Sequence, residues 1–173
     1  MRSDLLFIRG KSYELYSTSN HRYARRIHYR KTQHIIGNIN DIISAHKYDI
    51  IIATKFINYQ ESPFVKHLQW TEMIDKNTDL LPSIESLSDY IIEKNGYHCG
   101  QDLIDVLKEN NIEDINIVGI DTDACVLVNA IYLFDNGFNV SVHSQACAST
   151  GGESIHKSAI EILKRNIGSQ NVL

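Results

Sequence analysis

The feature that most constrains this chain is the alternation of short β-type runs with stretches of helical periodicity. In the helical stretches apolar residues recur every three or four positions, which leaves one side apolar and the other polar. Strands that alternate with helices of this kind predict βαβ units, a parallel sheet and right-handed crossovers. We therefore expect a three-layer α/β/α fold. Strands are predicted at Leu5–Ile8, Ile50–Thr54, Tyr90–Lys94, Ile115–Ile120, Val140–His143 and, as a short sixth, Asn171–Leu173, and helices at Tyr23–Ile43, Gly100–Asn111, Cys125–Asn136 and Ser154–Asn166.

The composition fits a single domain that spans residues 1–173. With 173 residues and 43% hydrophobic content, the chain can bury a full core without a disulfide or a structural metal. No apolar run approaches the roughly 18 residues of a membrane span, and Met1–Gly10 lacks the pattern of a secretory signal. Three widely spaced cysteines make neither a disulfide framework nor a zinc motif. We expect a cytoplasmic protein with reduced thiols and no cofactor.

Positive charge is concentrated near the N-terminus. Residues 1–50 hold nine Lys and Arg against four Asp and Glu, although the whole chain has a net charge of −4. Most of this excess lies in a predicted basic helix over Arg22–Lys31. Such a cluster could contact nucleic acid or an acidic partner. The alternative, a solvated helix face, is favoured because no glycine-rich loop, zinc-finger spacing or interleaved aromatic pattern accompanies it.

One segment interrupts the alternation of strands and helices. Residues Ile57–Ser88 show little periodicity and contain Pro63, Trp70 and Pro82. Loops of this length in a compact domain are usually functional lids or partner contacts. The alternative is a loop with one short helix near Phe64–Trp70 that covers a sheet edge.

The carboxyl ends of the predicted strands indicate where chemistry would take place. Ligands of an open parallel sheet bind beyond these ends, near the point where strand order reverses. Here the strand ends supply Arg9, Thr54–Phe56, Lys94 and Gly119–Cys125. We expect the functional site among these residues.

Cys125 is the most informative residue of this set. It is predicted in the first turn of a helix directly after a strand, where the helix dipole stabilises a thiolate and backbone N–H groups can receive an oxyanion. The alternative is a small buried residue without reactivity. Cys99 and Cys147 fit that structural role better, since neither begins an apolar helix after a strand.

Two segments, GIDTDACV at Gly119–Val126 and IIEKNGY at Ile91–Tyr97, stand at strand ends. The first resembles the strand-to-helix turn, and the second the lysine strand, of the isochorismatase-like cysteine hydrolases, a family that includes isochorismatases, nicotinamidases and N-carbamoylsarcosine amidohydrolases. The resemblance continues through Val140–Thr150 and the helix around His156, although Gln145 stands where an aspartate is usual. It spans essentially the whole chain and is weakest before residue 50.

The resemblance implies a Rossmann-like sheet of six parallel strands in the order 3-2-1-4-5-6. It implies that Cys125 is the nucleophile and that Lys94 is its cationic partner. It also implies a cis peptide bond between Ile120 and Asp121, which aims the N–H groups of Asp121 and Cys125 at an oxyanion. The chemistry would be attack of a thiolate on an amide or a related electrophilic carbon, followed by release of the covalent intermediate by water.

The chain departs from the family at the end of the first strand. Relatives carry an aspartate there, whereas this segment reads Leu5-Leu6-Phe7-Ile8-Arg9. Arg9 therefore occupies the position of the family acid. An arginine stabilises a thiolate, but it cannot shuttle protons at neutral pH. Glu14 and Asp121 are the substitute acids that the sequence offers.

The chain also lacks the zinc motif of the family's nicotinamidases, an Asp-x-His pair after the second strand. That region reads Thr54-Lys55-Phe56-Ile57-Asn58. The eight histidines are scattered, and none forms a pair at ligand spacing. We expect no metal site.

Three functions compete at this point. The first is a metal-free cysteine hydrolase that acts on a small molecule, and the second is a catalytically impaired relative that binds or regulates. The third is an interaction module that uses the basic helix. As is usual in the family, we expect a homo-oligomer, with no membrane contact, and a nucleic-acid partner is disfavoured. The fold does not specify the substrate. The candidate pocket walls are Phe56, Trp70, Tyr97 and His98.

Overall fold

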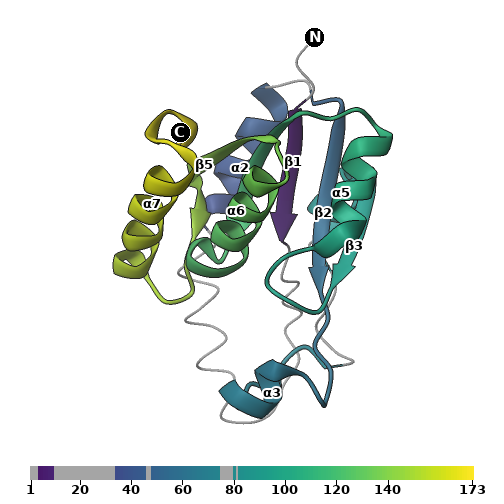
Figure 1. Ribbon diagram of the computed structural model, residues 1–173, viewed down its shortest axis with the longest axis vertical. Helices are drawn as coiled ribbons and strands as arrows, with labels where there is room; N and C mark the ends of the chain where they lie inside the picture. The colour runs from purple at the N-terminus through teal and green to yellow at the C-terminus, as the bar shows by residue number, and fades with distance from the viewer. Residues whose placement is uncertain (1–3, 10–33, 46–47, 75–79, 81) are drawn as a thin grey trace.

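The computed structural model describes residues 4–9, 34–45, 48–74, 80 and 82–173. Its strands form one parallel sheet in the order β3-β2-β1-β4-β5 (Figure 1). The strand order therefore reverses between β1 and β4, as expected for an open α/β sheet. The strands are β1 (Asp4–Arg9), β2 (Ile50–Phe56), β3 (Tyr90–Lys94), β4 (Asp114–Ile120) and β5 (Asn139–Ala148).

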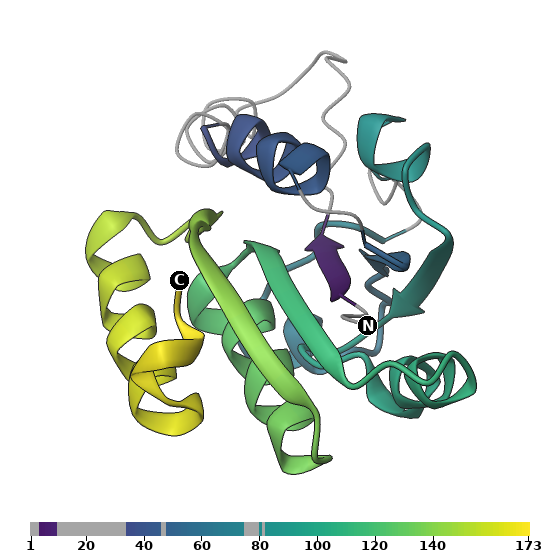
Figure 2. The ribbon, with the colours of Figure 1, turned by 90° about the horizontal axis from the view of Figure 1, so that it is seen from above.

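Helices cover both faces of the sheet, which gives the three predicted layers (Figures 1 and 2). On one face lie α2 (Ile35–Ala45) and the short α4 (Pro82–Glu85). On the other face lie α5 (Gly100–Glu109), α6 (Leu127–Asp135) and α7 (Glu153–Ile167). Each interface between helices and sheet is filled by a hydrophobic cluster, as the apolar faces of the helices predicted.

The last strand is longer than the sequence indicates. β5 continues past its predicted end at His143 to Ala148. Its pairing with β4 is irregular between the pairs Ile117–Val142 and Gly119–Cys147, where β5 contains extra residues. This irregularity interrupts the period-two pattern, which explains why the sequence did not indicate the second half of the strand.

The predicted sixth strand is not confirmed. Asn171–Leu173 contributes one isolated parallel bridge, between Val142 and Val172. Leu173 N donates to Val142 O at 2.9 Å, and Ser144 N donates to Leu173 O at 2.8 Å. The six-stranded order 3-2-1-4-5-6 is therefore not confirmed, and the five strands found follow the order 3-2-1-4-5.

The turn that carries Cys125 differs from its prediction. The sequence predicted an α-helix from Cys125 onward, but Thr122–Val126 form a π-helical turn and α6 begins at Leu127. Val126 N donates to Asp121 O at 3.1 Å, a bond that spans five residues. Cys125 therefore lies within a wide turn and not in the first turn of an α-helix. Apolar spacing does not separate the two cases, because both keep the same side chains facing the sheet.

The segment Ile57–Ser88 contains two short helices in its described part. The helix expected near Phe64–Trp70 is α3 (Pro63–Leu68), which lies beyond the carboxyl ends of the strands (Figure 1). Ser62 caps it, since its Oγ accepts a hydrogen bond from Val65 N at 3.2 Å. The second helix, α4, was not expected.

Several predicted features fall outside the described residues. They include the basic helix Arg22–Lys31, the substitute acid Glu14 and the part of the helix predicted at Tyr23–Ile43 that precedes residue 34. The remaining part of that helix corresponds to α2. Over the described ranges, no helix is both long and apolar enough to span a bilayer.

The packing of α6 on the sheet can be tested through Leu133, which is fully buried in the cluster beneath this helix. We predict that Leu133→Ala lowers the free energy of unfolding by about 2–5 kcal/mol, because it leaves a cavity in a packed core. Urea denaturation measures this change. Leu68→Ala is the control, since Leu68 on α3 is 60% exposed, and its effect should stay within about 0.5 kcal/mol. Similar losses in both variants would contradict the described burial of α6.

Candidate active site

The predicted site residues lie at the carboxyl edge of the sheet. Arg9 ends β1 and pairs with Thr54 of β2, and Phe56 of β2 pairs with Lys94 of β3. β4 ends at Ile120, and the peptide bond that follows it is cis. Only the backbone of Arg9 is described. The register therefore places the backbone of Arg9 beside that of Thr54.

Cys125 is buried in the π-helical turn after β4, with 4% of its surface exposed. The turn is anchored to α7, because Thr122 Oγ1 lies 2.8 Å from His156 Nδ1. It is also anchored to the loop after β5. The Asp121 carboxylate accepts hydrogen bonds from Thr150 N at 2.9 Å and from Thr150 Oγ1 at 3.0 Å. The carboxylate predicted as a substitute acid thus holds this loop in place.

Lys94 is a buried cation at the end of β3, with 6% of its surface exposed. Its Nζ donates to Gly96 O at 3.0 Å and to Tyr97 O. The loop that follows β3 therefore folds back so that its carbonyl groups solvate the ammonium. Hydrogen bonds to a charged donor are stronger than those between neutral groups, so they fix the side chain.

Asn129 connects the loop of Lys94 with the turn of Cys125. This residue of α6 is fully buried. Its Nδ2 donates to Tyr97 O at 2.9 Å and to Cys125 O at 2.7 Å, and its Oδ1 accepts from Cys99 N at 2.9 Å. Asn129 was not predicted from the sequence. The available signal was one amide side chain on the apolar face of a helix, at the position four residues after the cysteine.

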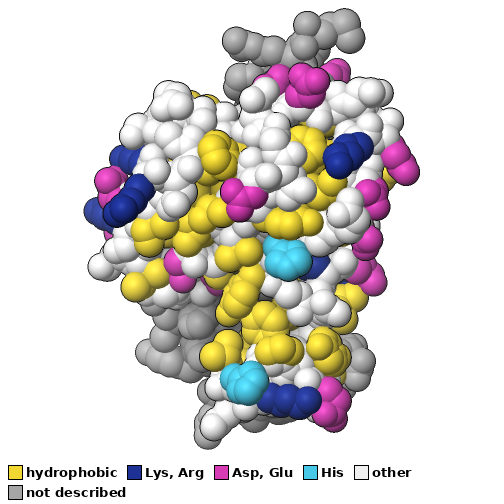
Figure 3. Space-filling view, in the orientation of Figure 1, with side chains coloured by type: hydrophobic (Ala, Val, Ile, Leu, Met, Phe, Trp, Pro, Cys, Tyr) yellow, Lys and Arg dark blue, Asp and Glu magenta, His cyan; other side chains and the backbone are white. Residues whose placement is uncertain are grey.

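Three of the four predicted pocket walls meet around Phe64. Its ring centroid lies 5.1 Å from that of Phe56, 5.8 Å from that of Trp70 and 5.1 Å from that of Tyr97. We call Phe56, Phe64, Trp70 and Tyr97 the aromatic cluster. Figure 3 shows hydrophobic side chains running down this face of the molecule toward α3. The aromatic cluster joins the ends of β2 and β3 to the cap formed by α3.

The fourth predicted wall, His98, also contacts α6. Its ring stacks on Tyr132 with centroids 5.1 Å apart, and its Nδ1 accepts a hydrogen bond from Gly100 N at 3.0 Å. His98, Lys94 and Asn58 line a cavity of about 630 Å³. The lysine and the histidine thus share one cavity wall.

The region after β2 does not fit a zinc site. Phe56 belongs to the aromatic cluster, and the amide of Asn58 is fully used. Asn58 Nδ2 donates to Trp70 O at 3.1 Å and to Glu72 O at 3.0 Å, while its Oδ1 accepts from Tyr59 N at 3.0 Å and Ser62 Oγ at 2.5 Å. These bonds close the turn before α3. Within the described ranges, no group of three or more His, Cys, Asp or Glu is placed to hold a metal ion.

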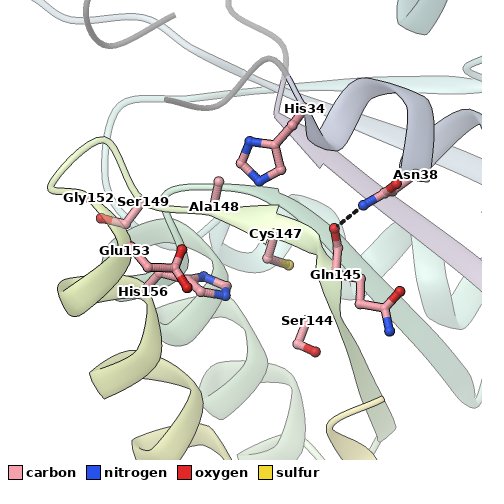
Figure 4. Close-up of a pocket in the computed structure, with 10 residues that line it drawn as sticks. All are labelled: His34, Asn38, Ser144, Gln145, Cys147, Ala148, Ser149, Gly152, Glu153 and His156. Carbon is pink, nitrogen blue, oxygen red and sulfur yellow. Dashed lines mark hydrogen bonds between the residues drawn. The ribbon is translucent and has the colours of Figure 1, made fainter. Parts of the chain in front are cut away.

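A second cavity, of about 450 Å³, lies between α2, β5 and α7 (Figure 4). His34, Glu153 and His156 face it, and Asn38 Nδ2 donates to Gln145 O at 2.5 Å along its wall. Burial lowers the pKa of His156, and this effect outweighs that of the Glu153 carboxylate, which raises the pKa. The imidazole of His156 is therefore mainly neutral near pH 7.

The cysteines occupy different surroundings. Cys147 lines the second cavity, and its burial raises the pKa of the thiol to about 12. It therefore stays protonated at neutral pH, as expected for a structural cysteine. Cys99 is buried just before α5. Cys125 lines neither of the two cavities.

Comparison with known sequences identifies relatives. Residues 24–170 match the family model described as Isochorismatase domain. The isochorismatase family protein PncA of Bacillus subtilis is 37% identical over 83 residues, which are 47% of this chain and 45% of that protein. Isochorismatase family protein 1A of Dictyostelium discoideum is 30% identical over 124 residues, which are 69% of this chain and 58% of that protein. The chain thus spans about half the length of the curated relatives it matches.

Solved structures share the fold at low sequence identity. An isochorismatase-like hydrolase from Alkaliphilus metalliredigens has a TM-score of 0.76 at 17% identity, covering 99% of this chain and 92% of that one. Nicotinamidase PncA from Bacillus subtilis has a TM-score of 0.72 at 22% identity, covering 97% of both chains. N-carbamoylsarcosine amidase from Thermoplasma acidophilum has a TM-score of 0.65 at 16% identity, covering 93% and 92%. Because the family model matches most of its length, the chain belongs to the isochorismatase family.

Proposed function

We propose that this chain is a metal-free cysteine hydrolase that attacks a small amide, or a related carbonyl compound, through Cys125. The observation that carries this proposal is the hydrogen-bonded path from Lys94 through Tyr97 O and Asn129 to Cys125 O. The path joins a buried cation to the turn of a cysteine at the sheet edge where such folds bind ligands. Relatives of the same fold include a nicotinamidase and an N-carbamoylsarcosine amidase, which supports an amide substrate.

In the first step of the proposed reaction, the Cys125 thiolate forms a bond to the carbonyl carbon. Lys94 stabilises the thiolate, because a positive charge acts strongly on a nearby anion in a buried site. The carbonyl electron pair moves to the oxygen, where the N–H groups of Asp121 and Cys125 would receive it. The electron pair on oxygen then re-forms the carbonyl as the C–N bond breaks, the amine takes its proton from water, and the acyl group remains on sulfur as a thioester.

The second step removes the acyl group. Water attacks the thioester carbon and must lose a proton. The C–S bond then breaks, which releases the carboxylic acid and regenerates the Cys125 thiolate. A general base normally takes this proton, but the strand-one position holds Arg9, which stays protonated at neutral pH. The Asp121 carboxylate, an acid at this edge of the sheet, already accepts two hydrogen bonds from Thr150. We therefore propose that acylation is supported and deacylation is slow.

Arg9 at the end of β1 also favours a second candidate function. With Arg9 in place of the acid and Cys125 almost fully buried, the chain would be a small-molecule binding or regulatory protein that turns over little substrate. The interaction module built on Arg22–Lys31, the homo-oligomer and the cytoplasmic location remain predictions.

The reactivity of Cys125 tests the first step. We predict that iodoacetamide alkylates Cys125 faster than Cys99 and Cys147 at neutral pH, because Lys94 stabilises its thiolate. Lys94→Met should slow alkylation of Cys125 by about 10-fold or more and leave Cys147, which lines the other cavity, unchanged. Mass spectrometry of the three cysteine peptides measures each rate in the native protein. Faster labelling of Cys147, or no response to Lys94→Met, would show that Cys125 is not a tuned nucleophile.

Replacement of Arg9 tests the second step. We predict that Arg9→Asp raises steady-state ammonia release from nicotinamide or another family amide by about 10²–10⁴-fold, because it restores a general base. Arg9→Ala is the control, since it removes the cation without supplying a base, and it should not raise turnover. A wild-type turnover already in the ordinary range of about 1–10³ per second would refute slow deacylation. Asp121→Asn and Glu14→Gln would then identify the working acid.

The metal content tests the proposed metal-free chemistry. Protein purified without chelator should contain far less than one zinc per chain by elemental analysis, because Phe56 and the saturated amide of Asn58 occupy the region after β2. A strong chelator should leave the alkylation rate of Cys125 unchanged. Stoichiometric zinc would contradict the proposal and favour a metal-dependent amidase.

A further inference from the structure

We infer that Asn129 is a positioning residue that fixes the position of the Lys94 ammonium relative to the Cys125 turn. The inference rests on the proposed function, in which Lys94 stabilises the Cys125 thiolate. Asn129 itself would not contact the substrate. It would act through the lysine.

The side-chain amide of Asn129 joins three segments of backbone. Its two N–H groups donate to Tyr97 O at 2.9 Å and to Cys125 O at 2.7 Å, and its oxygen accepts from Cys99 N at 2.9 Å. Both donors of the amide are therefore used, and so is its oxygen. Since Asn129 is fully buried, water does not compete for these bonds. The amide fixes the loop after β3 and the turn after β4 at one point.

The link to Lys94 passes through one carbonyl oxygen. Tyr97 O accepts from Asn129 Nδ2 and also from Lys94 Nζ, which donates in addition to Gly96 O at 3.0 Å. A displacement of the Tyr97 carbonyl would therefore carry the ammonium with it. Electrostatic interactions in a buried site are strong and depend on distance, so a small displacement changes the stabilisation of an anion.

Packing alone does not explain an amide at this position. The neighbouring buried side chains of α6, Ala130 and Leu133, are apolar and belong to the cluster beneath the helix. Burial of an amide is costly unless every polar atom is bonded, and an apolar side chain would carry no such cost. The three hydrogen bonds offset this cost, and they connect the two functional segments.

Asn136 provides a matched comparison on the same helix segment. Its Nδ2 donates to Tyr132 O at 2.8 Å, four residues earlier, just as Asn129 donates to Cys125 O. Asn136 is exposed and lies at the C-terminal cap of α6. It therefore shares the local bond of Asn129 without the connection to the loop of Lys94.

The test is a double-mutant cycle on the alkylation rate of Cys125. Asn129→Leu keeps the branching and the number of side-chain heavy atoms and removes the three hydrogen bonds, and it is combined with Lys94→Met. We expect Asn129→Leu to slow alkylation by about 10-fold in the wild-type background and to have little further effect when Lys94 is already absent. Asn136→Leu should stay within about twofold of wild type.

A pH profile separates positioning from a general loosening of the fold. At alkaline pH all of the thiol is ionised, so the limiting alkylation rate reports access to Cys125. The inference predicts that Asn129→Leu shifts the profile to higher pH and leaves this limiting rate unchanged. A change of the limiting rate alone, or equal slowing with and without Lys94, would assign Asn129 a purely structural role and overturn the inference.

Two further outcomes separate the inference from the proposed function. If Lys94→Met slows alkylation and Asn129→Leu does not, the inference is wrong and the proposed function stands. If Lys94→Met has no effect, the proposed role of Lys94 fails and the inference fails with it. Should Asn129→Leu not fold, the same cycle is decided by Asn129→Ala, which also removes the three hydrogen bonds of the amide.

Discussion

The carbonyl group of Tyr97 is the point on which the candidate site depends. It accepts hydrogen bonds from Lys94 at the end of β3 and from Asn129 on α6, and Asn129 also holds the carbonyl of Cys125. A buried ammonium needs such partners, because burial of an unsolvated charge is costly. The parallel sheet brings the ends of β3 and β4 to the same edge, and these hydrogen bonds then connect the lysine with the cysteine turn.

The residues at the carboxyl edge of the sheet bear differently on the two steps of the proposed reaction. The glycine-containing strand end, the cysteine turn and the lysine are present. β1 ends in Arg9, and the region after β2 is part of the cap, through the aromatic ring of Phe56 and the hydrogen-bonded amide of Asn58. In the proposed reaction, Lys94 and the turn of Cys125 would support formation of a thioester, whereas Arg9 would not supply the base that hydrolyses it.

The sequence predicted the parts of the structure that depend on periodicity and on strand ends. β3 ends at Lys94 as expected, and the parallel sheet brings Lys94 and the Cys125 turn to one edge. The predicted start of α6 was wrong, because apolar spacing does not distinguish a π-helical turn from an α-helical one. Asn129 was missed because its role arises from contacts with Tyr97 and Cys99, which are distant in sequence. No local pattern encodes such contacts.

The central claim is that Cys125 acts as a nucleophile whose acyl intermediate is released slowly. The most direct measurement is mass spectrometry of the intact protein during incubation with an amide substrate such as nicotinamide, together with the ammonia released. The account predicts a burst of about one ammonia per chain and an acyl group that accumulates on the Cys125 peptide and is absent from Cys125→Ser. Multiple turnovers without a detectable adduct, or an adduct on Cys99 or Cys147 instead, would contradict it.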